Sequence, residues 1–259
     1  MAGRKFFAAR MALALTLLGA LVAGCASSTG GSGAGVTPTV PAASSPATVT
    51  PDAPSVRYVA LGASDAVGVG ASDPNHTAYV PILISRLPKG ATALNLGISG
   101  ETLHGALTDE LPAAIQAQPT LITIWLVGND FKDCVPLSQY TADLNTLLTQ
   151  LQTKTSARVF VANAPDFSLL PAIQQAAAAG SFCGGPPTQA AIHAETIQWN
   201  QAIDATVAAH HDTLVDLYNA DLAGHLDYIS SDGFHPSDAG YLALANLFWA
   251  AITEQKAAA

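Results

Sequence analysis

Short apolar runs alternate with longer amphipathic stretches along most of this chain. A short apolar run that is ended by Gly, Asn or Asp is typical of a buried parallel strand. Such runs predict strands at residues 56–61, 92–96, 121–127, 158–162 and 213–217. Between them, apolar residues recur at helical spacing. This spacing predicts helices at residues 78–87, 102–118, 140–151, 169–179, 190–209 and 237–252, the last with Ser237 as its N-cap.

The alternation of strands and helices predicts an α/β domain, with a parallel sheet that is covered by helices on both faces. In such a sheet, ligands bind just beyond the carboxyl ends of the strands. We therefore expect a site at this edge of one domain, which spans residues 55–254. No glycine-rich phosphate-binding motif follows a strand, so no nucleotide or other cofactor is expected.

The first 25 residues have the pattern of an export signal. Arg4, Lys5 and Arg10 precede an apolar stretch that is too short for a confident membrane span. The segment ends in LVAGC at Cys25, which resembles the lipobox of bacterial lipoproteins, where this cysteine carries the lipid. An ordinary secretory signal with an incidental cysteine is the alternative. With the lipoprotein interpretation, we expect a protein that is exported and anchored through Cys25 to the outer face of a bacterial membrane, at the cell surface or in the periplasm.

Residues 26–54 are rich in Ser, Thr, Pro, Gly and Ala and have almost no charge. A segment of this composition cannot bury a core, so we expect a disordered tether between the anchor and the folded domain. At the other end of the chain, residues 253–259 are expected to be a frayed helix end.

The charge balance argues against nucleic acid as a partner. Three of the ten Lys and Arg residues precede Cys25, whereas all nineteen Asp and Glu residues follow it. The folded part is therefore strongly acidic and repels a phosphate backbone. We expect a monomer.

Two cysteines remain after Cys25, and both lie in loop-like contexts. Cys134 precedes Val-Pro, and Cys183 precedes Gly-Gly-Pro-Pro. An even number of cysteines in an exported domain favours a disulfide between Cys134 and Cys183, with two unpaired thiols as the alternative. The spacing of the cysteines does not match a metal site, and no metal is expected.

Four places carry polar chemistry at strand ends or in a late loop. They are Ser64, Gly97, Asn129 and the run Ser-Asp-Gly-Phe-His-Pro that contains Asp232 and His235. Ester hydrolysis through a serine needs a base beside the hydroxyl, an acid that orients the base, and donors for the developing oxyanion. His235 fits the base and Asp232 the acid. The N–H groups of Ser64 and Gly97 and the side-chain amide of Asn129 fit the donors. Each residue taken alone also fits a plain turn or a helix cap.

Together these blocks resemble the SGNH hydrolases of the GDSL esterase/lipase superfamily. The matching blocks are ALGASD, NLGISGET, VGND and SDGFHP, in this order, over roughly residues 57–251. The resemblance implies a three-layer α/β/α sandwich with a five-stranded parallel sheet, a flavodoxin-like fold. It also implies Ser64 as nucleophile, His235 as base and Asp232 as its partner, with Ser64, Gly97 and Asn129 in the oxyanion hole.

One position departs from the family pattern. The usual Gly-Asp-Ser is Gly62-Ala63-Ser64 here, and an acid follows the serine as Asp65. Because the missing aspartate is not a catalytic group, its loss affects the support of the loop more than the reaction. We expect Asp65 to compensate by capping the first helix.

The family acts on lipids, thioesters, aryl esters and acetylated polysaccharides, so the expected substrate is a small-molecule, lipid or acetylated glycan ester. Two other functions stay open at this stage. The same site can transfer an acyl group to an alcohol other than water, or the chain can be a non-catalytic surface binding module.

Overall fold

A computed structural model describes residues 55–183 and 187–258 of the chain. The export signal, the lipobox cysteine Cys25 and the tether lie outside these residues and stay predictions. Within the part that is described, no helix is both long and apolar enough to cross a membrane.

Five parallel strands form the single sheet of the described domain, in the order β2-β1-β3-β4-β5. The strands are β1 (Arg57–Gly62), β2 (Thr92–Asn95), β3 (Leu121–Trp125), β4 (Arg158–Ala162) and β5 (Thr213–Val215). The central strand β3 is buried along its whole length, and β1 is buried from its second residue onward. By contrast, β2 is exposed throughout, because it lies at the edge and pairs with β1 alone.

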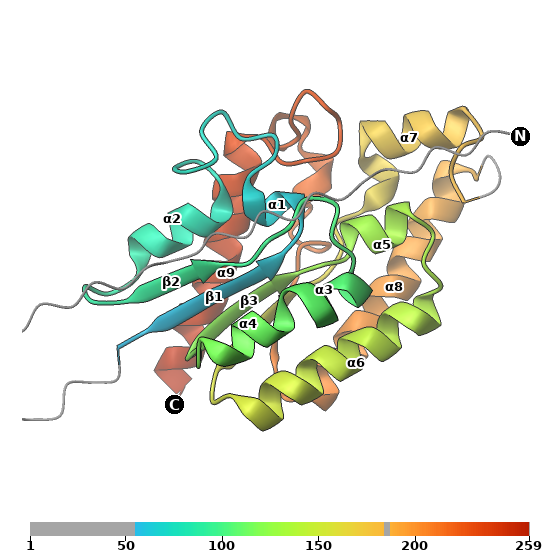
Figure 1. The fold of residues 1–259 in the computed structure, drawn as a ribbon. Coiled ribbons are helices and arrows are strands. Elements are labelled where there is room, and N and C mark those ends of the chain that lie inside the picture. Colours follow the sequence, from blue (N-terminus) through green and yellow to red (C-terminus); the bar gives the residue numbers. More distant parts are fainter. Residues whose placement is uncertain (1–54, 184–186, 259) are drawn as a thin grey trace, which may run out of the picture. The chain divides into compact units, whose positions relative to one another are not determined.

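Helices cover both faces of the sheet, which gives the predicted three-layer arrangement (Figure 1). The helices are α1 (Ser64–Val67), α2 (Tyr79–Arg86), α3 (Leu103–Asp109), α4 (Leu111–Gln116), α5 (Gly128–Lys132), α6 (Leu137–Lys154), α7 (Pro171–Ala178), α8 (Gln189–Ala209) and α9 (Asp238–Ala258). Short 3₁₀ turns are η1 (Phe167–Leu169), η2 (Leu222–Gly224) and η3 (Leu226–Tyr228). On one face α2 packs against α9, and on the other α6 packs against α3, α4 and α8.

The fold class and the five strands are confirmed, and most helices lie where the apolar spacing predicts them. Ser237 accepts a hydrogen bond from the Gly240 N–H at 3.3 Å, as an N-cap does. The helix that follows continues to Ala258, past the expected end at residue 252.

The prediction of one helix over residues 102–118 is wrong. The segment divides at Glu110 into α3 and α4, and Pro112 lies in the first turn of α4. Proline has no N–H to continue the ladder of the preceding helix, and its ring favours the start of a new one.

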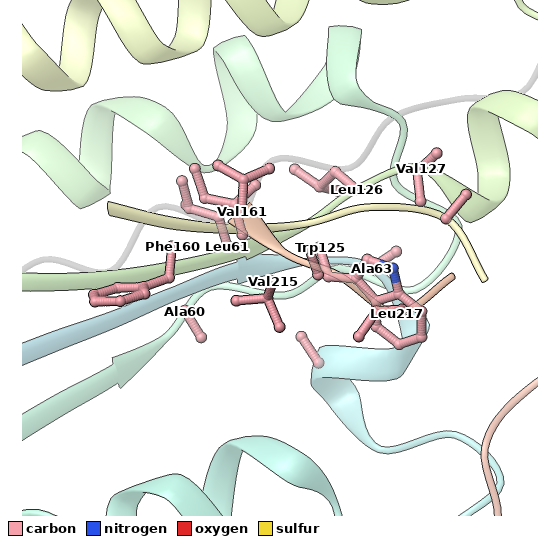
Figure 2. Close-up of a cluster of buried hydrophobic side chains, with 14 of the residues drawn as sticks. Ala60, Leu61, Ala63, Trp125, Leu126, Val127, Phe160, Val161, Val215 and Leu217 are labelled. Atoms are coloured by element: carbon pink, nitrogen blue, oxygen red, sulfur yellow. The ribbon is translucent and has the colours of Figure 1, made fainter. Parts of the chain in front are cut away.

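The apolar core continues up to the carboxyl ends of the strands. Figure 2 shows Trp125, Leu126 and Val127 of the β3 end beside Ala63, which follows β1. All four are buried. The polar residues that follow these strands are therefore positioned by a packed apolar core.

Candidate active site

Ser64 lies at the carboxyl end of β1, where the chain turns into α1. A Cβ on Gly62 would lie 2.8 Å from the Cβ of Ala66, so a residue without a side chain is needed for this tight change of direction. Ser64 is buried, and its Oγ is within hydrogen-bond distance of His235 Nε2. The predicted turn after the first strand thus holds the serine in one fixed position.

His235 lies between Ser64 and Asp232. Its Nε2 is 2.8 Å from Ser64 Oγ, and its Nδ1 is 2.6 Å from Asp232 Oδ2. Ser64 and His235 are 171 residues apart in the sequence. The fold therefore brings together the serine, histidine and aspartate that the sequence selects, in the order that nucleophilic catalysis requires.

A short loop holds Asp232 in an ionised state. Its Oδ1 accepts hydrogen bonds from the N–H groups of Phe234 at 2.8 Å and His235 at 2.9 Å, and from Ser230 Oγ at 2.9 Å. Burial alone would raise the pKa of Asp232, but these bonds and the one to His235 outweigh it and lower the pKa to about 2. Gly233 makes the bend between Asp232 and His235 with a φ of +75°.

The three expected oxyanion donors differ in whether their N–H groups already have an acceptor. The Ser64 N–H has no acceptor among the described residues. The Asn129 side chain donates one amide hydrogen to the Glu101 carbonyl at 2.8 Å, and the second hydrogen is available.

The Gly97 N–H, in contrast, donates to Asn95 Oδ1 at 3.1 Å and is not available as it stands. Gly97 is needed for close packing, since a Cβ there would lie 2.5 Å from Ala66 Cβ. Three residues later, the N–H of Gly100 has no acceptor in the described part of the chain, and Gly100 has a φ of +85°. The sequence contains this second glycine in the same block, but spacing alone does not separate the two.

A family model described as GDSL-like Lipase/Acylhydrolase matches residues 60–243, which is more than half of the chain. The chain belongs to this family. A comparison with curated protein sequences gave no significant match.

Several solved structures share the fold. TesA has 22% identity and a TM-score of 0.59, covering 76% of this chain and 97% of its own. The esterase EstA from Pseudoalteromonas sp. has 19% identity and a TM-score of 0.59, covering 77% and 97%. Axe2, an acetylxylan esterase from Geobacillus stearothermophilus, has 18% identity and a TM-score of 0.58, covering 76% and 94%. At these identities the likeness concerns the fold alone.

A buried carboxyl group supports the GDSL-family serine from behind, and sequence reasoning missed it. Glu110 is fully buried, and its Oε2 accepts the Gly62 N–H at 2.9 Å, two residues before Ser64. Burial raises its pKa to about 8, against the opposing effect of that hydrogen bond, so the group is protonated at neutral pH. A signal was present, because Glu110 falls seven residues after Leu103, on the apolar face of the segment.

The predicted disulfide is confirmed. Cys134 and Cys183 are bonded, with Cα atoms 5.4 Å apart. The bond joins the end of the α5 segment, which carries Asn129, to the loop after α7. Beside it, Phe131 packs on Phe167 and Phe182, with ring centroids 4.5 and 5.9 Å apart. The crosslink and this aromatic cluster hold the Asn129 segment against the body of the domain.

The expectation that Asp65 caps the first helix is wrong. The N-cap of α1 is Ala63, and no side chain makes a capping hydrogen bond there. Instead Asp65 lines a small hollow beside Ser64 whose other walls are almost entirely apolar. Burial raises the pKa of Asp65 to about 6; the charge of His235 opposes this rise, and that of Asp232 adds to it.

The remaining histidines do not form a metal centre. His210 contacts Asn145 on the surface, at 2.9 Å from Nε2 to Oδ1, and His193 contacts Asp166 at 2.7 Å. Across residues 55–183 and 187–258, no group of three or more His, Cys, Asp or Glu residues could hold a metal ion.

Proposed function

We propose that this protein hydrolyses carboxylic esters through an acyl-enzyme on Ser64. The observation that carries the proposal is the position of His235, 2.8 Å from Ser64 Oγ and 2.6 Å from Asp232 Oδ2. Membership of the GDSL-like lipase/acylhydrolase family supports hydrolase chemistry at this site.

In the proposed reaction, Ser64 Oγ attacks the ester carbonyl carbon and gives its proton to His235 Nε2. The Nδ1–H of His235 donates to Asp232, whose negative charge stabilises the imidazolium. When the tetrahedral intermediate collapses, the carbon–oxygen bond to the alcohol breaks and His235 returns the proton to the departing oxygen. A water molecule then attacks the acyl-enzyme by the same route and releases the acid.

The negative charge on the carbonyl oxygen needs donors that are already in place. We assign this role to the Ser64 N–H and the free amide hydrogen of Asn129. A third donor comes from the loop of residues 97–100, where the unpaired N–H of Gly100 is better suited than that of Gly97. Loss of one such donor typically raises the barrier by about 3–4 kcal/mol.

The hollow beside Ser64 favours short acyl groups. Its volume is about 30 Å³, which gives room for roughly two water-sized groups. A long acyl chain has no place in it without movement of the apolar walls. Within the range of GDSL-family substrates, this supports esters of short acids over long-chain lipids.

The test is turnover of p-nitrophenyl esters from acetate to palmitate by the full-length protein. We expect the highest kcat/KM for acetate to butyrate, and a loss of about 10⁴-fold or more in Ser64→Ala. Ser85→Ala is the matched control, since this serine lies exposed on α2 and its hydroxyl donates to the Ile82 carbonyl. A fluorophosphonate probe should label the wild type and Ser85→Ala but not Ser64→Ala. Unchanged turnover in Ser64→Ala would refute the assignment of the nucleophile.

A further inference from the structure

The proposed oxyanion donor Asn129 is oriented by a contact with the loop that leads from β2 to α3. Its side-chain amide donates one hydrogen to the Glu101 carbonyl at 2.8 Å. An amide group turns easily about its last side-chain bond, so this contact decides where the second amide hydrogen points. The position of the Glu101 carbonyl is therefore part of the geometry of the oxyanion site.

Hydrogen bonds fix the chain on both sides of that carbonyl. Before it, the Ile98 N–H donates to the Gly62 carbonyl at 3.1 Å, and the Glu101 N–H donates to the Ile98 carbonyl at 3.0 Å. After it, the Leu103 N–H donates to Asp130 Oδ2 at 2.9 Å. The loop is thus joined to the end of β1 at one point and to α5 at the other. In Figure 1 it passes beside α5.

The Leu103 N–H depends on Asp130 for its acceptor. Leu103 is the first residue of α3, and an N–H group at this position has no partner within its own helix. The N-cap Thr102 accepts the Gly105 N–H instead, at 3.2 Å. Leu103 and Asp130 are both buried, so water has little access to either group. Without Asp130, the start of α3 loses its hydrogen bond to α5.

The burial of Asp130 has a cost that its paired oxygen must offset. The other oxygen, Oδ1, is buried and has no partner among the described residues, which is unfavourable for folding. The benefit of this side chain therefore lies in what Oδ2 holds. Asn129 and Asp130 are neighbours in α5, and together they contact both ends of residues 101–103.

We propose that Asp130 is a positioning residue, which holds residues 101–103 so that the Glu101 carbonyl orients the Asn129 amide toward the oxyanion. Asp130 acts through Asn129 and makes no contact with the reacting atoms. This inference rests on the proposed function, because it concerns the oxyanion donors of the same site.

The first test measures kcat and KM of the full-length protein with p-nitrophenyl butyrate. We expect Asp130→Leu to lower kcat by about 10- to 100-fold and to change KM by less than about threefold, because the oxyanion forms only along the reaction. Asp130→Asn keeps an acceptor oxygen for the Leu103 N–H and should recover most of the lost kcat. An Asn variant as slow as the Leu variant would overturn the proposal. Asp130→Ala, which avoids crowding by leucine, replaces Asp130→Leu if the latter does not fold.

Asp143→Leu is the matched control. Asp143 is also a buried carboxyl group that contacts α3, with its Oδ2 at 3.2 Å from His104 Nδ1 and at 2.9 Å from Gln139 Nε2. It lies on α6 and has no hydrogen bond to residues 101–103 or to Asn129. We expect a loss of stability but a change in kcat of less than about twofold. A loss of kcat equal to that of Asp130→Leu would mean that any loosening of α3 has this effect, which would overturn the proposal.

A double-mutant cycle tests whether Asp130 acts through Asn129. Asn129→Ala alone should lower kcat by about 100-fold, as the loss of an oxyanion donor does. Adding Asp130→Leu should then lower kcat by less than about threefold, since no amide is left to orient. If the two single losses multiply in the double variant, Asp130 acts independently of Asn129 and the proposal is wrong.

An NMR measurement separates failure of this inference from failure of the proposed function, because it needs no turnover. In ¹⁵N-labelled full-length protein, the side-chain amide signals of Asn129 are identified by their absence in Asn129→Ala. We expect Asp130→Leu to shift them and to speed their hydrogen exchange by about 10-fold, whereas Asp143→Leu leaves both unchanged. This result without ester turnover in the wild type would refute the hydrolase and keep the positioning of Asn129. Unchanged signals in Asp130→Leu would refute the positioning role whatever the turnover.

Discussion

Asp232 contacts His235, whereas Asp65 follows Ser64 in the chain, and the surroundings of these two aspartates differ in kind. Asp232 accepts hydrogen bonds from two backbone N–H groups, from Ser230 and from His235, and its pKa falls to about 2. Asp65 lines an apolar hollow without a side-chain partner, and burial raises its pKa to about 6. The Asp232 carboxyl group therefore stays ionised over the working pH range, whereas the charge of the Asp65 carboxyl group changes with pH. Hydrogen bonds to the Asp232 carboxylate, the one from His235 among them, make this difference.

The largest expected effect separates the two aspartates by their influence on the chemical step. Asp232→Asn should lower kcat for p-nitrophenyl butyrate by about 10³- to 10⁴-fold, because the carboxylate orients His235 and stabilises its charged form. Asp65→Asn should change it by less than about fivefold, since this carboxylate contacts neither Ser64 nor His235. Comparable losses in the two variants would remove the distinction between them.

Glu110 sharpens the comparison as a third carboxyl group, which is fully buried and accepts a hydrogen bond from the Gly62 N–H. Glu110→Leu leaves the Gly62 N–H unpaired behind the serine, so we expect about a tenfold loss of kcat and a loss of about 2 kcal/mol in the free energy of unfolding. Glu110→Gln keeps the acceptor and should restore most of both. Denaturant unfolding and ester kinetics on the same samples check this. If Gln behaves like Leu, the hydrogen bond to Gly62 is not what matters.

A smaller effect tests whether the donors around Asp232 act as a set. Ser230→Ala removes one of the hydrogen bonds to Oδ1 and keeps the two from the backbone. We expect kcat to fall by about two- to fivefold, with KM unchanged, because the loop still holds the carboxylate ionised. Steady-state kinetics with p-nitrophenyl butyrate measures both constants. A loss as large as that of Asp232→Asn would mean that Ser230 alone positions the aspartate.

The smallest effect concerns how the stability of the fold depends on pH. Substitution of the two aspartates should change this dependence in opposite directions. The Asp65 pKa is raised from 3.8 to about 6, so the native state binds the extra proton and the stabilisation is lost as pH rises through this window. The Asp232 pKa is lowered from 3.8 to about 2, so its stabilisation is lost as pH falls through that window. Relative to wild type, the Tm of Asp65→Asn should therefore rise by a few degrees between pH 4 and pH 7. That of Asp232→Asn should fall between pH 2 and pH 5.

Thermal unfolding followed by circular dichroism across this pH range measures both differences. Parallel pH profiles of the two variants would contradict the opposite shifts of the two carboxyl groups.

The sequence predicted well what depends on local pattern. Apolar runs and helical spacing located the strands, and block order selected Ser64, Asp232 and His235, which the fold brings into contact. The two cysteines were also paired correctly. These features follow from short stretches whose chemistry is independent of distant side chains.

What the sequence could not predict depends on neighbours from other elements. The Gly97 N–H donates to Asn95 Oδ1, and the Asn95 side chain is oriented by its own hydrogen bond to the Ala66 carbonyl in α1, which spacing does not reveal. The prediction that Asp65 caps a helix failed because the residues that surround it come from the β3 end and from η2, which lie far along the chain. Glu110 was placed inside a continuous helix, although its position on an apolar face and the proline after the next residue were both visible.

The disulfide between Cys134 and Cys183 has a consequence for how the domain can be made. It closes a loop of 49 residues, which lowers the entropy of the unfolded chain and stabilises the fold by about 4 kcal/mol in the chain-entropy model. This is a large fraction of the 5–15 kcal/mol that typically separates folded from unfolded chains. In a reducing environment the domain therefore loses much of its free energy of unfolding. Its yield should depend on the oxidising power of the compartment in which it folds.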